Sequence, residues 1–171
     1  MNKRRIIVRG PALSRSGYGE QCRFALRALR AFEDKFDIFL INTNWGATSW
    51  MSEDTEERQW LDELIIKANL ALREPQPHFD VSLQVTIPNE WQKMAPHNIG
   101  YTAGIETTQV APQWIEKSRE VDHIITISNH SKSVFEKTTY SIQSQSGEKV
   151  ESDCKLVNNL QSTINDDIVN I

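Results

Sequence analysis

The sequence predicts an α/β fold with an open, mainly parallel sheet and helices on both faces. Three observations predict it. Short β-branched apolar runs alternate with helical patterns, the apolar residues of those patterns recur at the spacing of one helix face, and the first run leads through a glycine-containing loop into a helix. Strands that alternate with helices favour right-handed crossovers, and therefore parallel pairing.

The first elements along the chain are a strand, a helix and a second strand. Residues 4–8, which contain the apolar run IIV at residues 6–8, are a candidate for a buried strand, and residues 37–43 (DIFLINT) are a second one. Between them, residues 18–32 have an apolar face. Its members are Cys22, Ala25, Leu26, Leu29 and Phe32. This order is that of one β-α-β unit.

The later elements continue the same alternation. A helix is predicted for residues 53–72, with Leu61, Leu64, Ile65, Ala68 and Leu72 on its apolar face. Further strands are predicted at residues 81–87, 98–104 and 123–128, and helices at residues 112–120 and 129–138. Pro112 suits the first turn of its helix, and Ser128 suits the N-cap of the last one.

The pattern ends near residue 140. Residues 140–171 are rich in Ser, Asn and Gln, and only residues 155–160 resemble a strand. The sequence therefore predicts one α/β domain over residues 1–139. The remainder, residues 140–171, is predicted to be a polar tail or an incomplete continuation toward a further domain.

Composition limits the class of protein. The chain has 171 residues, 39% hydrophobic and 25% charged, which is enough to bury one core. A formal charge of −4 argues against a nucleic-acid partner, because binding a phosphate backbone needs a dense Lys and Arg surface.

The apolar segments are short. None approaches the roughly 20 residues that span a bilayer, and the start, MNKRRIIVRG, lacks the apolar region of a signal peptide. The sequence therefore predicts a cytoplasmic protein without a transmembrane segment.

Neither cysteine nor histidine follows a metal-binding pattern. Cys22 lies in a predicted helix and Cys154 in the polar tail, so no disulfide framework or paired-cysteine metal site is indicated. The four histidines show no ligand spacing. We expect no metal ion and no cofactor.

The loop after the first strand is the strongest candidate site. Gly10, Gly17 and Gly19 surround it, and glycine permits positive φ or a close approach of a ligand to the backbone. The helix that follows offers free N–H groups and a positive dipole end, which suits an anionic or polyol ligand. The spacing matches neither the dinucleotide fingerprint nor a phosphate loop, and a turn that only joins strand to helix is the competing interpretation.

Three other loops carry candidate residues. Trp45 and Trp50 could stack on sugars, but covering the core is the favoured interpretation for them. Glu106 follows a predicted strand as either a functional acid or a solvated one. Ser128 and Ser131 lie at a strand end, where helix capping is sufficient to explain Ser128.

Two segments together, RSGYGEQCRFALRAL and NIGYTAGIETTQVAPQWIEKSREVDHIITISNHSKSVF, resemble a known family. The chain is similar, over residues 4–138, to the N-terminal domain of GT-B glycosyltransferases of the group 1 kind, including versions found in phage genomes. The resemblance implies a Rossmann-like domain whose inter-domain cleft is lined by the glycine loop. The residues matching the motifs are Ser16, Gly17, Tyr18 and Gly19 in that loop, Glu106 and Thr107 in a Glu-Thr loop, Pro112 and Trp114 in a Pro-x-Trp helix, Ser128 at a strand end, and Phe135 on the last helix.

The resemblance also implies what the chain lacks. A complete GT-B enzyme has a second Rossmann-like domain that binds the nucleotide-sugar donor with two glutamates eight positions apart, and this sequence has no pair with that spacing. The chain is therefore expected to be the acceptor-side half of a hexosyltransferase-like enzyme, to contact a sugar acceptor, and to be inactive alone. Substrate-binding roles are expected for the glycine-loop residues, Glu106, Thr107 and Ser128, with Glu106 placed to orient an acceptor hydroxyl.

Two other functions fit the sequence. One is a non-catalytic α/β module that binds a sugar or nucleotide without turnover. The other is a small Rossmann-like enzyme that uses a nucleotide and is complete in itself. A second α/β domain encoded downstream would favour the transferase. The oligomeric state, the donor and the acceptor are not fixed by the sequence.

Overall fold

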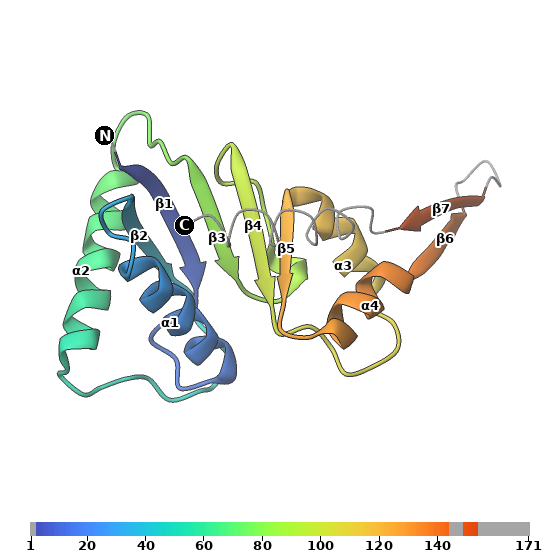
Figure 1. Cartoon of the computed structure of the whole chain (residues 1–171), viewed down its shortest axis with the longest axis horizontal. Coiled ribbons are helices and arrows are strands. Elements are labelled where there is room, and N and C mark those ends of the chain that lie inside the picture. Colours follow the sequence, from blue (N-terminus) through green and yellow to red (C-terminus); the bar gives the residue numbers. More distant parts are fainter. Residues whose placement is uncertain (1–2, 144–148, 154–171) are drawn as a thin grey trace. The chain divides into compact units, whose positions relative to one another are not determined.

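The computed structural model describes residues 3–143 and 149–153. Within them the chain alternates strands and helices almost throughout (Figure 1). In chain order the elements are β1 (Arg4–Gly10), α1 (Gly17–Arg30), β2 (Phe36–Asn42), α2 (Glu56–Ala71), β3 (Val81–Val85), the 3-10 helix η1 (Pro88–Glu90), β4 (His97–Thr102), α3 (Pro112–Lys117), the 3-10 helix η2 (Ser118–Glu120), β5 (His123–Thr126), α4 (Asn129–Lys137), β6 (Thr139–Gln143) and β7 (Lys149–Asp153).

The described strands β1 to β5 form one parallel sheet in the order β2-β1-β3-β4-β5. This arrangement with its helices is an α/β, Rossmann-like fold, so the predicted fold class is confirmed. The described residues fall into two compact units. The first runs to Thr86 and includes Lys93–Asn98, and the second comprises the other described residues.

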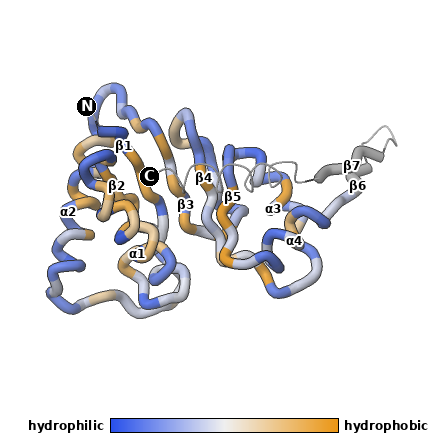
Figure 2. The backbone as a smooth tube through the Cα atoms, in the orientation of Figure 1, coloured by the Kyte–Doolittle hydropathy of each residue, from blue (hydrophilic) through white to orange (hydrophobic). Residues whose placement is uncertain are grey.

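In the first unit, α1 and α2 pack on opposite faces of the sheet. Ile7 of β1 and Phe39 of β2 form a cluster with Ala68 of α2. On the other face, Cys22 of α1 lies beside Gly10 of β1. A Cβ built on Gly10 would be only 2.9 Å from the Cys22 Sγ. The middles of β1 and β2 are coloured as hydrophobic in Figure 2, as expected for strands buried on both faces.

The second unit has its own core. Ile124 of β5 packs with Ile115 of α3 and with Val134 and Phe135 of α4. Trp91 is also buried there, 1% exposed, and a Cβ on Gly100 would be 2.5 Å from its ring. The close fit of strand β4 under this indole therefore requires a glycine.

Most predicted elements are present with ends shifted by a few residues. The helix predicted for residues 112–120 is α3 followed by the 3-10 turn η2, and Pro112 does lie in its first turn. Strands β6 and β7 form an antiparallel hairpin in a region where the sequence predicted no strand. The strand predicted at residues 155–160, and Cys154, lie outside the described residues.

Candidate functional site

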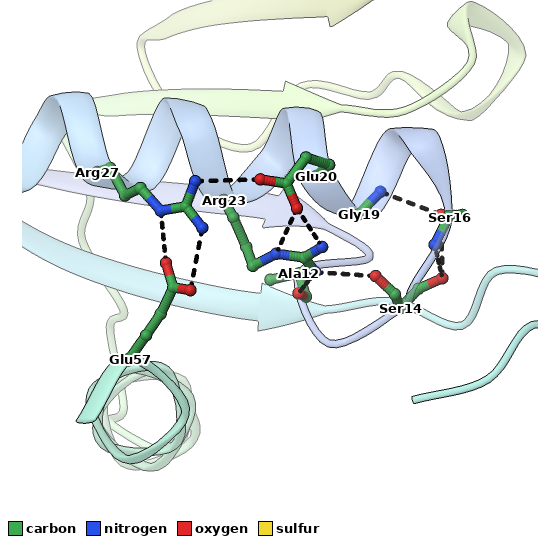
Figure 3. Close-up of polar contacts among 8 residues, drawn as sticks. All are labelled: Ala12, Ser14, Ser16, Gly19, Glu20, Arg23, Arg27 and Glu57. Carbon is green, nitrogen blue, oxygen red and sulfur yellow. Dashed lines mark hydrogen bonds and ion pairs between the residues drawn. The ribbon is translucent and has the colours of Figure 1, made fainter. Parts of the chain in front are cut away.

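The loop between β1 and α1 is held by a short network of serines (Figure 3). Ser16 caps α1, since its Oγ accepts a hydrogen bond from the Gly19 N–H at 3.0 Å. The Ser14 hydroxyl donates to the Ser16 Oγ at 2.9 Å. The start of α1 is therefore fixed by side chains of the loop that precedes it.

A buried arginine, Arg23, also fixes this loop. Arg23 has a side chain only 7% exposed, and its guanidinium donates to the carbonyl oxygens of Ala12 at 2.6 Å and Ser14 at 2.8 Å. The same guanidinium pairs with Glu20 at 2.6 Å (Figure 3). A buried charge is stable only with such partners, so Arg23 acts as a structural link between loop and helix.

The glycines of this loop do not use the positive φ that glycine permits. Among the described residues, positive φ occurs at Gly46 (51°) and Gly104 (76°), and not at Gly17 or Gly19. Gly19 is buried, and a Cβ there would be 2.9 Å from the carbonyl carbon of Ser14. Gly19 is thus needed for packing within the protein, whereas Gly17 is exposed and has open space where its Cβ would be.

The loop that follows β2 is paired with the loop that follows β1. The Arg15 N–H donates to the carbonyl of Ser49 and the Met51 N–H to that of Leu13, both at 2.9 Å. The hydroxyl groups of Ser14 and Thr48 are hydrogen-bonded at 2.7 Å. These bonds hold the two loops side by side at the carboxyl ends of neighbouring strands.

The prediction that the two tryptophans in this segment cover the core is wrong. Trp50 is 47% exposed. Trp45 is half-buried, and its ring lies against Tyr18, with the ring centroids 4.5 Å apart. The polar loop that carries them follows the end of β2, outside the sheet, and this explains their exposure.

A pocket of about 500 Å³ lies beside these two loops. Ser16 and Gly17, which the sequence predicts to bind substrate, line it. The full lining is Arg15, Ser16, Gly17, Glu20, Arg23, Arg27, Met51, Glu53 and Glu57. We refer to it as the charged pocket, and all of its lining residues belong to the first unit.

The charges of the charged pocket are paired with one another. Arg27 donates to both carboxylate oxygens of Glu57, at 2.6 and 3.0 Å, and to Glu20 at 3.0 Å (Figure 3). Arg15 pairs with Glu53. The hydrogen bond from Arg23, reinforced by Arg27, lowers the pKa of the Glu20 carboxyl. The pocket therefore offers fixed donors and acceptors, with balanced charge.

The remaining predicted residues belong to the second unit. Ser128 is the N-cap of α4, as predicted, and its Oγ accepts from the Ser131 N–H at 3.1 Å. Glu106 and Thr107 are exposed in the loop after β4, and the Thr107 hydroxyl donates to the carbonyl of Gln109 at 2.8 Å.

The predicted site residues thus form two groups. Ser16, Gly17, Tyr18 and Gly19 lie together at the start of α1, while Glu106, Thr107 and Ser128 lie at the carboxyl ends of β4 and β5 in the other unit. Sequence analysis missed the arginines and glutamates of the charged pocket. The spacing of Glu20, Arg23 and Arg27 by three and four residues was the available signal.

Within residues 3–143 and 149–153, no helix is both long and apolar enough to cross a membrane, and no group of three or more His, Cys, Asp or Glu side chains is arranged to hold a metal ion. Comparison of the chain with protein-family models, with curated proteins and with solved structures gives no match.

Proposed function

We propose that the chain is the acceptor-side, N-terminal domain of a GT-B glycosyltransferase, which moves a sugar from a nucleotide-sugar donor to an acceptor hydroxyl. In this proposal a second domain binds the donor. One observation carries it: Ser16 and Gly17, which match the glycine loop of that family, line an open pocket at the carboxyl ends of β1 and β2. Ligands of open α/β sheets bind beyond these ends.

The chemistry of the charged pocket supports a sugar acceptor. A sugar hydroxyl both donates and accepts, and the paired arginines and glutamates present both kinds of group in fixed positions. Arg27, for example, is held by two glutamates, so its orientation is set before a ligand arrives. The cytoplasmic location expected from the sequence is part of the same proposal.

A non-catalytic sugar-binding module is the second candidate, and one observation favours it. Each glutamate that lines the charged pocket is ion-paired with an arginine, namely Glu20 with Arg23, Glu53 with Arg15 and Glu57 with Arg27. For Glu20 and Glu53, the hydrogen bond from the paired arginine lowers the pKa of the carboxyl, which makes these two carboxylates poor general bases.

Transfer assays distinguish the two candidates. The purified chain is incubated with a panel of nucleotide sugars and saccharide acceptors, alone and joined to whatever domain its gene encodes next. We expect transfer only from the joined protein. Transfer or donor hydrolysis by the chain alone, lost on mutation of its pocket, would overturn the half-enzyme proposal. Saccharide binding without transfer by the joined protein would favour the binding module.

A further inference from the structure

Two threonines at the carboxyl edge of the sheet carry buried hydroxyl groups that have no hydrogen-bond partner among the described residues. Thr43 directly follows β2 and Thr86 directly follows β3. Within the part of the chain that the structure describes, neither Oγ1 has a hydrogen-bond partner, and Thr86 is 0% exposed. Buried polar groups are nearly always paired in folded proteins, so each of these atoms calls for an explanation.

The strand register places the two threonines on either side of Pro11. β1 pairs with β2 up to Gly10 and Asn42, and with β3 up to Arg9 and Gln84. Continued past these pairs, the register sets Thr43 and Thr86 opposite Pro11. With neighbouring strands about 4.8 Å apart, the two residues are separated by roughly 10 Å.

The end of β1 does not supply the missing partners. The Gly10 carbonyl already accepts from the N–H groups of Ala12 and Thr43, both at 3.0 Å. Pro11 has no N–H, and its carbonyl accepts from the Ser14 N–H at 2.9 Å. The backbone between the two threonines is therefore engaged in the loop itself.

Thr86 also ends a polar row on β3. Ser82, Gln84 and Thr86 alternate along the strand, so they share a face, and all three are fully buried. The Ser82 hydroxyl donates to Asn98 Oδ1 at 2.8 Å, and Gln84 Nε2 donates to Ser82 Oγ at 3.4 Å. The first two members of the row are thus paired, and the third, Thr86, lies at the carboxyl edge of the sheet, where open α/β sheets in general bind ligands.

The strand order makes this edge a favoured ligand position. The chain leaves β1 toward β2 on one side and returns for β3 on the other, and ligands of open α/β sheets bind at such reversals.

We infer that Thr43 and Thr86 form a polyol site, in which ligand hydroxyl groups pair with the two threonine hydroxyls. A threonine hydroxyl both donates and accepts a hydrogen bond, as the hydroxyl groups of a polyol do.

The site differs from the charged pocket, which neither threonine lines. Because both Oγ1 atoms are buried, the residues covering this edge must shift when a ligand binds. The inference rests on the proposed function only for the choice of a saccharide as the polyol. A disaccharide is long enough to reach both threonines, so maltose and trehalose are suitable probes, with inorganic phosphate as the anionic comparison.

Isosteric Thr→Val variants of the full chain test the site. Thr86→Val and Thr43→Val each remove an unpaired hydroxyl, so each should raise the thermal midpoint without ligand by about 2–4 °C. Each should also weaken disaccharide binding, measured by calorimetry, about tenfold. Thr138→Val is the matched control. Thr138 is as buried as Thr86, but its hydroxyl accepts from the Val110 N–H at 3.1 Å and donates to the Val134 carbonyl at 2.6 Å, so its loss should lower the midpoint and leave binding unchanged.

Three results would overturn the inference: disaccharide binding that Thr86→Val leaves unchanged, a lower midpoint for Thr86→Val, or binding of phosphate but of neither disaccharide. Failure of the proposed function looks different. If the chain binds maltose through Thr86 but supports no sugar transfer when joined to its neighbouring domain, the polyol site is supported and the proposed transferase function is refuted.

Discussion

The backbone of Ser14 occupies the space that a side chain on Gly19 would need. A Cβ on Gly19 would be 2.9 Å from the Ser14 carbonyl carbon and 3.0 Å from the Pro11 carbonyl oxygen. Both contacts are to backbone, which cannot move aside as a flexible side chain can. The loop after β1 is therefore folded tightly onto the first turn of α1.

Gly19→Ala should lower the free energy of unfolding by about 2–4 kcal/mol, because the methyl group forces loop and helix apart. Gly17→Ala is the control. Gly17 is also in the first turn of α1, has open space around its Cβ position and has no positive φ, so alanine there should be neutral or stabilising by about 0.5 kcal/mol. Urea denaturation measures both, and equal effects would contradict the packing role of Gly19.

Arg23→Lys should destabilise the chain although it keeps the charge. A lysine cannot donate at once to Ala12, Ser14 and Glu20 in the fixed geometry of a guanidinium, so buried carbonyl groups lose partners. We expect a loss of about 2–3 kcal/mol in denaturant unfolding. Arg27→Lys, at a side chain 42% exposed, should cost less than about 1 kcal/mol. An Arg23→Lys variant with an unchanged free energy of unfolding would refute the structural role of Arg23.

The ion pairs of Glu20 make stability depend on pH. The folded-state pKa of Glu20 is lowered, first by its hydrogen bond with Arg23, so the folded chain releases this proton more readily than the unfolded chain. The stabilisation is therefore complete above the ordinary value of 4.5, and is lost as pH falls through the folded pKa. Unfolding curves from pH 7 to 3 should show a smaller acid-induced loss for Glu20→Gln than for the unmodified chain. Identical pH profiles would exclude a contribution from Glu20.

The sheet was predictable because short runs rich in β-branched residues alternate with helical patterns along the chain. The ends of the helices were less predictable. Phe32 and Leu72 continue the apolar spacing of their helices, but Phe32 lies past the C-cap of α1 and Leu72 is the C-cap of α2, so they are 40% and 42% exposed. Residues 139–143 and 149–153 (TYSIQ and KVESD) have too little apolar alternation to indicate the β6–β7 hairpin.

The candidate site was predicted in position more than in chemistry. A glycine-rich loop at a strand end indicated where to look, and Ser16 and Gly17 do line a pocket. The sequence could not show that the backbone of Ser14 leaves no room for a side chain on Gly19, since that contact depends on the path of the loop. Arg23 was equally hidden, because a charged residue in a helical pattern indicates a solvent-facing side, and only the tertiary fold brings carbonyl groups to it.

Glu106 offers a direct test of function against structure. It is exposed in the loop that follows β4, and exposed sites without special partners change stability by no more than about 0.5 kcal/mol when substituted. Glu106→Gln should therefore leave the unfolding curve of the chain unchanged within that range. Glu33→Gln, also at an exposed position, is the control for loss of one surface charge.

The same variant should act on transfer if the proposed function is correct. A carboxylate that orients or deprotonates the acceptor hydroxyl contributes about 10²-fold to the rate, and glutamine keeps its size but cannot take a proton. In the protein joined to its donor domain, Glu106→Gln should thus lower kcat/KM by about 10²-fold, with Glu33→Gln unchanged. If instead Glu106→Gln lowers the thermal midpoint by several degrees while activity per folded molecule stays the same, Glu106 is a structural anchor of its loop and has no part in transfer.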